Sequence, residues 1–166
     1  MKIKSLVFLI LFAGCSYDNC NIKTNESFKQ ITVQNLIKDI YSVNNLSSFN
    51  SFLLENKNVL YPFYEVEDTS FLLDKVANAF TLIDNVYFDS LYNDVNTHFE
   101  NPLNLFYPLD NSFTKFNQQS NYKLSPNITI LISGFFNDVI VDKENIVIGL
   151  DYFLPKTNKY KPRDLP

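Results

Sequence analysis

The sequence predicts an α+β fold in which N-terminal helices pack on a small C-terminal β-sheet. Apolar residues recur at three- and four-residue intervals from about residue 31 to residue 116, which is typical of amphipathic helices. From Pro126 onward the pattern changes to short β-branched runs separated by turn residues. Strands that follow a series of helices favour an α+β architecture. At 166 residues the chain has the size of one domain and can bury a core without a disulfide or metal.

Four helical segments are expected. The first two are short and end before Tyr61-Pro62. The third is expected to run unbroken from Leu72 to about Phe99, with Thr69 or Ser70 as its cap. The fourth follows Pro102, and Pro108 must lie in its first turn or break it. The apolar positions behind these predictions are Ile31, Leu36, Ile37, Ile40, Leu46, Phe49, Phe52 and Leu53, then Leu72, Val76, Ala79, Phe80, Ile83, Tyr87, Leu91 and Val95, then Phe106, Leu109, Phe113 and Phe116.

Three strands are expected in the last third of the chain. Residues 128–132 form one β-branched run, and residues 139–141 and 146–148 flank a predicted hairpin turn at 142–145. We expect residues 128–132 and 146–150 to be neighbouring interior strands, because apolar runs of this kind need cover on both faces. The helix over residues 72–95 is expected to supply that cover.

The N-terminus has the organisation of a bacterial lipoprotein signal. Lys2 and Lys4 precede an apolar run at residues 6–12, and Ala13-Gly14-Cys15 follows. We therefore predict a signal peptide at 1–14, acylation of Cys15, a lipidated tether at 15–29 and a single domain at 30–166. The alternative is an ordinary secretory signal with a coincidental cysteine. In the lipoprotein interpretation Cys20 lies in the tether, where it could be a free thiol or pair with another chain, and an inert linker residue is favoured.

The charge balance limits the partners of the protein. The chain carries 14 basic and 18 acidic side chains, a formal charge of −4, and this argues against nucleic acid. Removal of residues 1–14 also removes Lys2 and Lys4, so lipid and not charge must hold the mature chain at the membrane. Ser16 follows the cysteine in place of the Asp that retains many lipoproteins in the inner membrane, which favours the outer membrane.

Few residues are suited to catalysis or metal binding. The single histidine, His98, stands outside any metal motif, and two cysteines do not make a soft-metal site, so no cofactor, metal or small-molecule substrate is predicted. The acidic residues Asp138, Asp142 and Glu144 fit a solvated hairpin end better than a calcium loop. Asp151 follows an apolar strand, where a partly buried carboxylate could act chemically or, as we favour, accept backbone hydrogen bonds. Ser133-Gly134 lacks the preceding Gly of a nucleophile elbow.

Two stretches of the β region resemble one known family. Residues 130–135, Ile-Leu-Ile-Ser-Gly-Phe, and residues 146–154, Ile-Val-Ile-Gly-Leu-Asp-Tyr-Phe-Leu, are similar to the GldB-like gliding-motility lipoproteins of Bacteroidetes. Residues 60–64 and 68–71 fit the same layout more loosely. Family members usually carry Gly where this chain has Pro155, and they continue beyond the segment matching residues 163–166, so a C-terminally truncated chain is expected.

The resemblance implies an envelope lipoprotein that is associated with gliding and its linked secretion machinery and has no established catalytic activity. We expect a non-catalytic component that docks on envelope proteins through a surface built around Asp151, Tyr152 and Phe153. The alternative is a degenerate or truncated zincin-like hydrolase. A zinc peptidase would need a pair of histidines on a helix, which this chain cannot supply.

Overall fold

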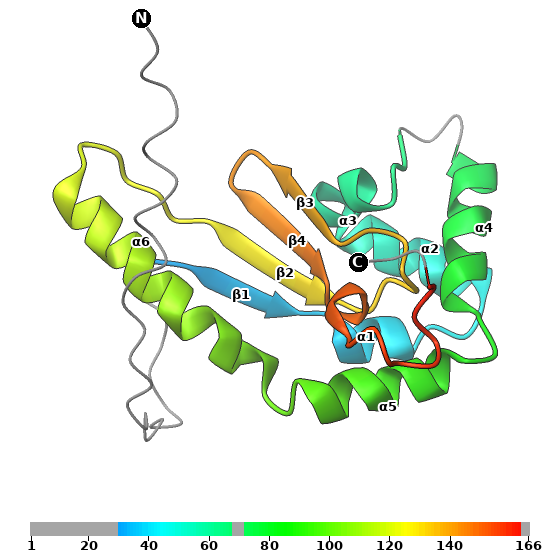
Figure 1. The fold of residues 1–166 in the computed structure, drawn as a ribbon. Coiled ribbons are helices and arrows are strands. Elements are labelled where there is room, and N and C mark those ends of the chain that lie inside the picture. Colours follow the sequence, from blue (N-terminus) through cyan, green and yellow to red (C-terminus); the bar gives the residue numbers. More distant parts are fainter. Residues whose placement is uncertain (1–29, 68–71, 164–166) are drawn as a thin grey trace, which may run out of the picture.

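The computed structural model describes residues 30–67 and 72–163, which form an α+β domain around a four-stranded mixed sheet (Figure 1). The strand order is β1-β2-β4-β3, where β1 is Thr32–Asn35, β2 is Asn127–Leu131, β4 is Asn145–Gly149 and β3 is Val139–Asp142. Strands β1, β2 and β4 are parallel, and β3 is antiparallel to β4. The predicted fold class is confirmed, and so is the prediction that the strands around 128–132 and 146–150 are interior neighbours.

Strand β1 corrects the sequence prediction, because it lies where a helix was expected. Its backbone pairs with β2, and the Leu36 N–H just beyond it donates to the Ile130 carbonyl at 2.9 Å. Helix α1, Ile37–Tyr41, begins only after the strand, and the Asn35 side chain accepts the Ile37 N–H at 3.0 Å. The sheet therefore takes its first strand from the N-terminal end of the domain and not only from the last third.

The next two helices follow the predicted apolar spacing more closely. Helix α2, Leu46–Glu55, starts at a capping box in which Asn45 accepts the Ser48 N–H at 2.8 Å. Helix α3, Lys57–Phe63, contains Pro62 in its last turn and ends one residue later. Tyr61-Pro62 thus lies inside the last turn of α3 and does not interrupt the helix, which corrects the predicted boundary.

The single long helix expected over residues 72–99 is two helices. Helix α4, Leu72–Ile83, and helix α5, Phe88–His98, are separated at residues 84–87, where the Asn85 side chain accepts the Tyr87 N–H at 2.9 Å. An Asn side chain that binds the backbone two residues ahead stabilises a turn in place of a helix. The proposed caps Thr69 and Ser70 lie outside the described residues.

The last helix is joined to the start of β1. A 3₁₀ helix, η1 at Pro102–Phe106, leads into α6, Tyr107–Gln119, and Pro108 lies in the first turn of α6 as one of the two predicted options. Buried Asp110 accepts the N–H groups of Gln30 and Ile31 at 2.7 and 3.1 Å. This link holds α6 alongside β1 at the edge of the sheet (Figure 1).

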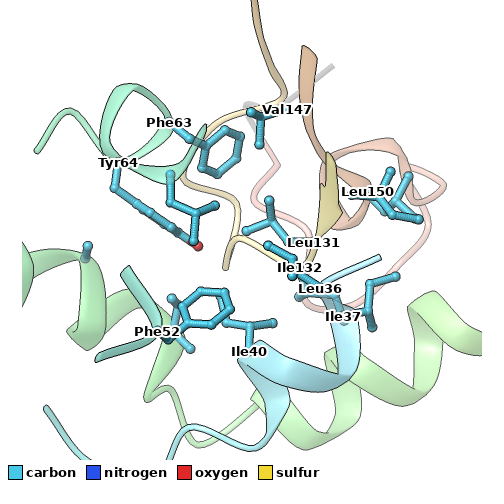
Figure 2. Packing of buried hydrophobic residues seen from close by; sticks show 14 of the residues in the cluster. Leu36, Ile37, Ile40, Phe52, Phe63, Tyr64, Leu131, Ile132, Val147 and Leu150 are labelled. Carbon is cyan, nitrogen blue, oxygen red and sulfur yellow. The ribbon is translucent and has the colours of Figure 1, made fainter. Parts of the chain in front are cut away.

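The helix cover of the interior strands differs from the prediction. Helix α3 packs against β4 and β3, and α1 packs against β2, whereas α4 packs mainly on α2, and α5 on α1 and on the segment after β4. Figure 2 shows the Phe63 ring of α3 facing Val147 of β4. Residues 72–95 are therefore not the main cover of the sheet. No helix within residues 30–67 and 72–163 combines the length and apolar character needed to cross a bilayer.

Candidate functional site

The two stretches that resemble the GldB-like lipoproteins, residues 130–135 and 146–154, meet at the carboxyl ends of β2 and β4. Asp151 lies in the 3₁₀ turn η2, Leu150–Phe153, directly after β4, and residues 133–137 form the turn directly after β2. Because β2 and β4 are parallel neighbours, their following residues emerge at the same edge of the sheet. In open sheets this edge is where ligands and functional groups are commonly found.

Asp151 is completely buried and its carboxylate organises the turn after β2. Oδ1 accepts the Ser133 N–H at 2.8 Å, and Oδ2 accepts the Phe135 N–H at 2.5 Å. The Ser133 hydroxyl lies 3.2 Å from both carboxylate oxygens and itself accepts the Phe136 N–H at 3.1 Å. These bonds satisfy the buried backbone donors of a segment that has no strand partner there.

The turn adopts an uncommon backbone conformation. Gly134 and Phe135 have φ values of 73° and 64°, in the left-handed region. A Cβ atom on Gly134 would lie 2.6 Å from the Leu82 carbonyl oxygen, so this position needs glycine for space as well as for conformation. The Asn137 side chain then donates to the Phe63 carbonyl at 2.7 Å and joins the turn to α3.

Burial dominates the electrostatics of this site. Loss of solvent raises the pKa of Asp151 above its ordinary value, and the hydrogen bonds from the Ser133 and Phe135 backbone oppose that rise. Burial also raises the pKa of Tyr64 well above its ordinary value, and the Asp151 charge adds to the effect. The Tyr64 hydroxyl has no hydrogen-bond partner among the described residues. Asp151 is therefore a sealed structural carboxylate beside a second buried polar group.

The three residues of the predicted interaction surface separate in the structure. Asp151 is completely buried, which corrects its place on an exposed surface, whereas Tyr152 is half-buried and Phe153 is 49% exposed. Tyr152 and Phe153 line a hollow of about 360 Å³. The other residues that line it are Asp138, Leu154, Pro155, Lys156 and Lys161.

Sequence reasoning missed Lys161 in this hollow. Its ammonium donates to the Tyr152 carbonyl at 2.7 Å and to the Leu154 carbonyl at 2.9 Å, and the residue is only 8% exposed. The Lys159-Tyr160-Lys161-Pro162 stretch has no apolar period, so nothing in the pattern distinguishes a buried lysine from its exposed neighbours. Only the fold of residues 152–161 places the Lys161 ammonium against the carbonyls of Tyr152 and Leu154.

A second hollow, of about 380 Å³, lies beside the turn after β2. Gly134 and Phe135 form part of its wall, and so do Tyr87 and Tyr160, whose ring centroids are 5.4 Å apart and whose ring planes are tilted by 34°. Lys159 lies 4.6 Å from the centre of the Tyr160 ring and lowers the pKa of that phenol. The turn at residues 133–137, which is hydrogen-bonded to Asp151, thus forms part of the wall of an aromatic hollow at the break between α4 and α5.

The remaining candidates do not converge on one centre. His98 ends α5 with its ring against Phe99, and Asp142 pairs with Asn145 across the predicted hairpin turn, next to exposed Glu144. Among the described residues, no three His, Cys, Asp or Glu side chains lie close enough to hold a metal ion. Cys15 and Cys20 lie outside the described residues.

The comparison with known families covers nearly the whole chain. A family model described as "Gliding motility protein GldB" matches residues 18–166, a range that includes both the turn after β2 and Asp151. No curated protein and no solved structure matches the chain.

Proposed function

The chain belongs to the gliding motility protein GldB family, and from that membership we propose that it is a lipid-anchored, non-catalytic component of a gliding or secretion assembly in the cell envelope. It acts by binding envelope protein partners. The family is one of gliding motility lipoproteins and is not known as an enzyme family. The anchor is the lipid on Cys15, the residues at 15–29 are the tether, and the domain at 30–166 carries the binding surfaces.

The hydrogen bonding of Asp151 is the observation that supports a scaffold role. This carboxylate is the group best placed for chemistry, because it is buried at the carboxyl edge of parallel strands. A general base must reach a proton on a substrate. Asp151 instead accepts the N–H groups of Ser133 and Phe135 and is closed to solvent. Its geometry fits the positioning of the turn after β2, in which Gly134 and Phe135 line a surface hollow.

The anchor is tested by metabolic labelling with a fatty-acid analogue in cells that express the full chain. The wild type and a Cys20→Ala variant should label and fractionate with outer membranes, whereas Cys15→Ala should do neither. Cys20 is the matched control because it is the other thiol of the chain and lies in the same proposed tether. Labelling of Cys15→Ala at the wild-type level would contradict the anchor.

The non-catalytic role is tested by assays of the purified full chain against casein and generic ester substrates with and without Zn²⁺. We expect no turnover in either condition and expect crosslinking in intact cells to recover envelope proteins. Turnover that depends on Zn²⁺ would favour the hydrolase alternative and overturn the proposal.

A further inference from the structure

Lys161 is a buried cation that forms no ion pair with any acidic side chain of residues 30–67 and 72–163. The residue is 8% exposed, and its ammonium has two neutral acceptors, the carbonyls of Tyr152 and Leu154. An ammonium has three N–H donors, so these two bonds leave one donor without an acceptor in the part of the chain that the structure describes. Within residues 30–67 and 72–163, the ion pair that forms is Lys75 with Glu67, and it lies elsewhere. Buried charges in proteins are normally paired, because neutral partners alone do not offset the loss of water.

The surroundings of this ammonium are apolar and partly open. Leu154 is buried beside it, Phe153 is 49% exposed, and Pro155 is exposed at the rim. Lys156 adds a second positive charge to the same hollow, and Asp138 is the one acidic side chain in its lining. In a chain whose formal charge is −4, this places local positive charge against exposed apolar surface.

From this arrangement we propose that the hollow is a docking site for a protein segment that carries a carboxylate next to an apolar side chain. The carboxylate accepts the free donor of Lys161, and the apolar side chain packs on Phe153 and Pro155. The inference rests on the proposed function as a partner-binding protein and assigns the chemistry of one binding surface.

The composition of the hollow favours a peptide carboxylate over a phosphate group. Asp138 at the rim repels a dianionic phosphate more strongly than a single carboxylate, because the Coulomb energy scales with charge. The exposed Phe153 ring and Pro155 offer apolar contact that a lipid headgroup would leave unused.

A single tryptophan can report binding at this site, because the chain has no Trp. Phe153→Trp in the full-length chain, purified in neutral detergent, places the fluorophore at the rim. The probes are the peptide N-acetyl-Ala-Leu-Phe with a free carboxylate and the same peptide as its C-terminal amide. We expect the acid to bind at least tenfold more tightly than the amide. Equal binding of the two, or no saturable response to either, would overturn the proposal.

Two lysine variants in the Phe153→Trp background locate the effect. Lys161→Met should remove the preference for the acid, whereas Lys159→Met should keep it, because Lys159 lies at the other hollow. If Lys161→Met unfolds the segment at 152–154, the comparison of acid and amide with Lys161 intact still decides the outcome.

The source of the anion is tested with the same reporter. Inorganic phosphate and phosphatidylglycerol vesicles should each respond at least tenfold more weakly than the acid peptide, and an equal or stronger response would overturn the assignment to a protein carboxylate. The result is separable from the proposed function, since failure of Cys15 labelling would contradict the anchor without changing this titration.

Discussion

Ser133 gives both its backbone N–H and its hydroxyl to the carboxylate of Asp151, which lies 18 residues further along the chain. The two residues follow the neighbouring parallel strands β2 and β4, so one side chain fixes how both strands leave the sheet. The stability of this edge of the domain should therefore depend on the acceptor character of Asp151.

Replacing Asp151 by Asn should lower the free energy of unfolding at pH 7 by about 1–3 kcal/mol. The amide keeps one acceptor oxygen but turns an NH₂ group toward buried N–H donors, and charge-assisted hydrogen bonds are the stronger kind. Chemical denaturation followed by circular dichroism measures the change. Asp138→Asn is the matched control, because Asp138 is exposed, and its effect should stay within about 0.5 kcal/mol. Equal effects of the two variants would contradict the role of Asp151.

The stability difference between the wild type and Asp151→Asn should decrease as pH rises. Burial raises the pKa of Asp151 above its ordinary value of 3.8, so the folded protein holds this proton more tightly than the unfolded chain. The resulting stability is complete below pH 3.8 and is lost as pH passes through the raised pKa. The free energy of unfolding of both proteins is measured across this pH range. Subtracting one value from the other removes the contribution of the other carboxylates, which the two proteins share. A difference that grows with pH would mean that the hydrogen bonds outweigh the burial.

Gly134→Ala should destabilise the domain by more than about 2 kcal/mol. The new Cβ meets the Leu82 carbonyl oxygen at 2.6 Å, and the left-handed backbone at φ 73° is unfavourable for alanine. Gly149→Ala separates these causes, because its Cβ would overlap the Asn137 carbonyl while its own φ is −82°. Thermal unfolding of both variants is the measurement, and an unchanged midpoint for Gly134→Ala would refute the described turn.

An acidic substitution at Val147 should be more damaging than the same change at Ile148. The apolar run at 146–150 predicts that Ile148 is interior and that Ile148→Asp costs several kcal/mol. In the structure Ile148 is half-buried, whereas Val147 is 2% exposed and faces α3. A buried unpaired carboxylate is costly in proportion to its loss of water. We expect Val147→Asp to lose cooperative unfolding and Ile148→Asp to retain it at a lower midpoint. The reverse order would place α3 on the wrong face of the sheet.

Local sequence determined the elements whose signals lie within a few residues. The β-branched run at 128–132, the hairpin turn at 142–145 and the apolar spacing of α2 predicted their structures, because each signal is carried by a few consecutive residues. The family could also be predicted, since its most specific residues occur at 130–135 and 146–154.

Tertiary contacts decided the features in which the prediction was wrong. Residues 32–35 form a strand only because β2, some 95 residues later, supplies their partner, although the run Ile31-Thr32-Val33 carried a β-branched signal. The periodicity from Leu72 to Phe99 continues across the break at 84–87, where Asp84-Asn85 was the local signal for a turn.

The sequence by itself determined the α+β class, the family and the presence of a carboxylate after β4. The tertiary structure decided that Asp151 is sealed inside and that Lys161 is buried against two carbonyl oxygens, with no ion pair among the described residues. The physical reason is that burial of a polar residue depends on which distant segments cover it. The Asp151 carboxylate is covered by the turn after β2, and the Lys161 ammonium lies beneath the carbonyls of residues 152 and 154.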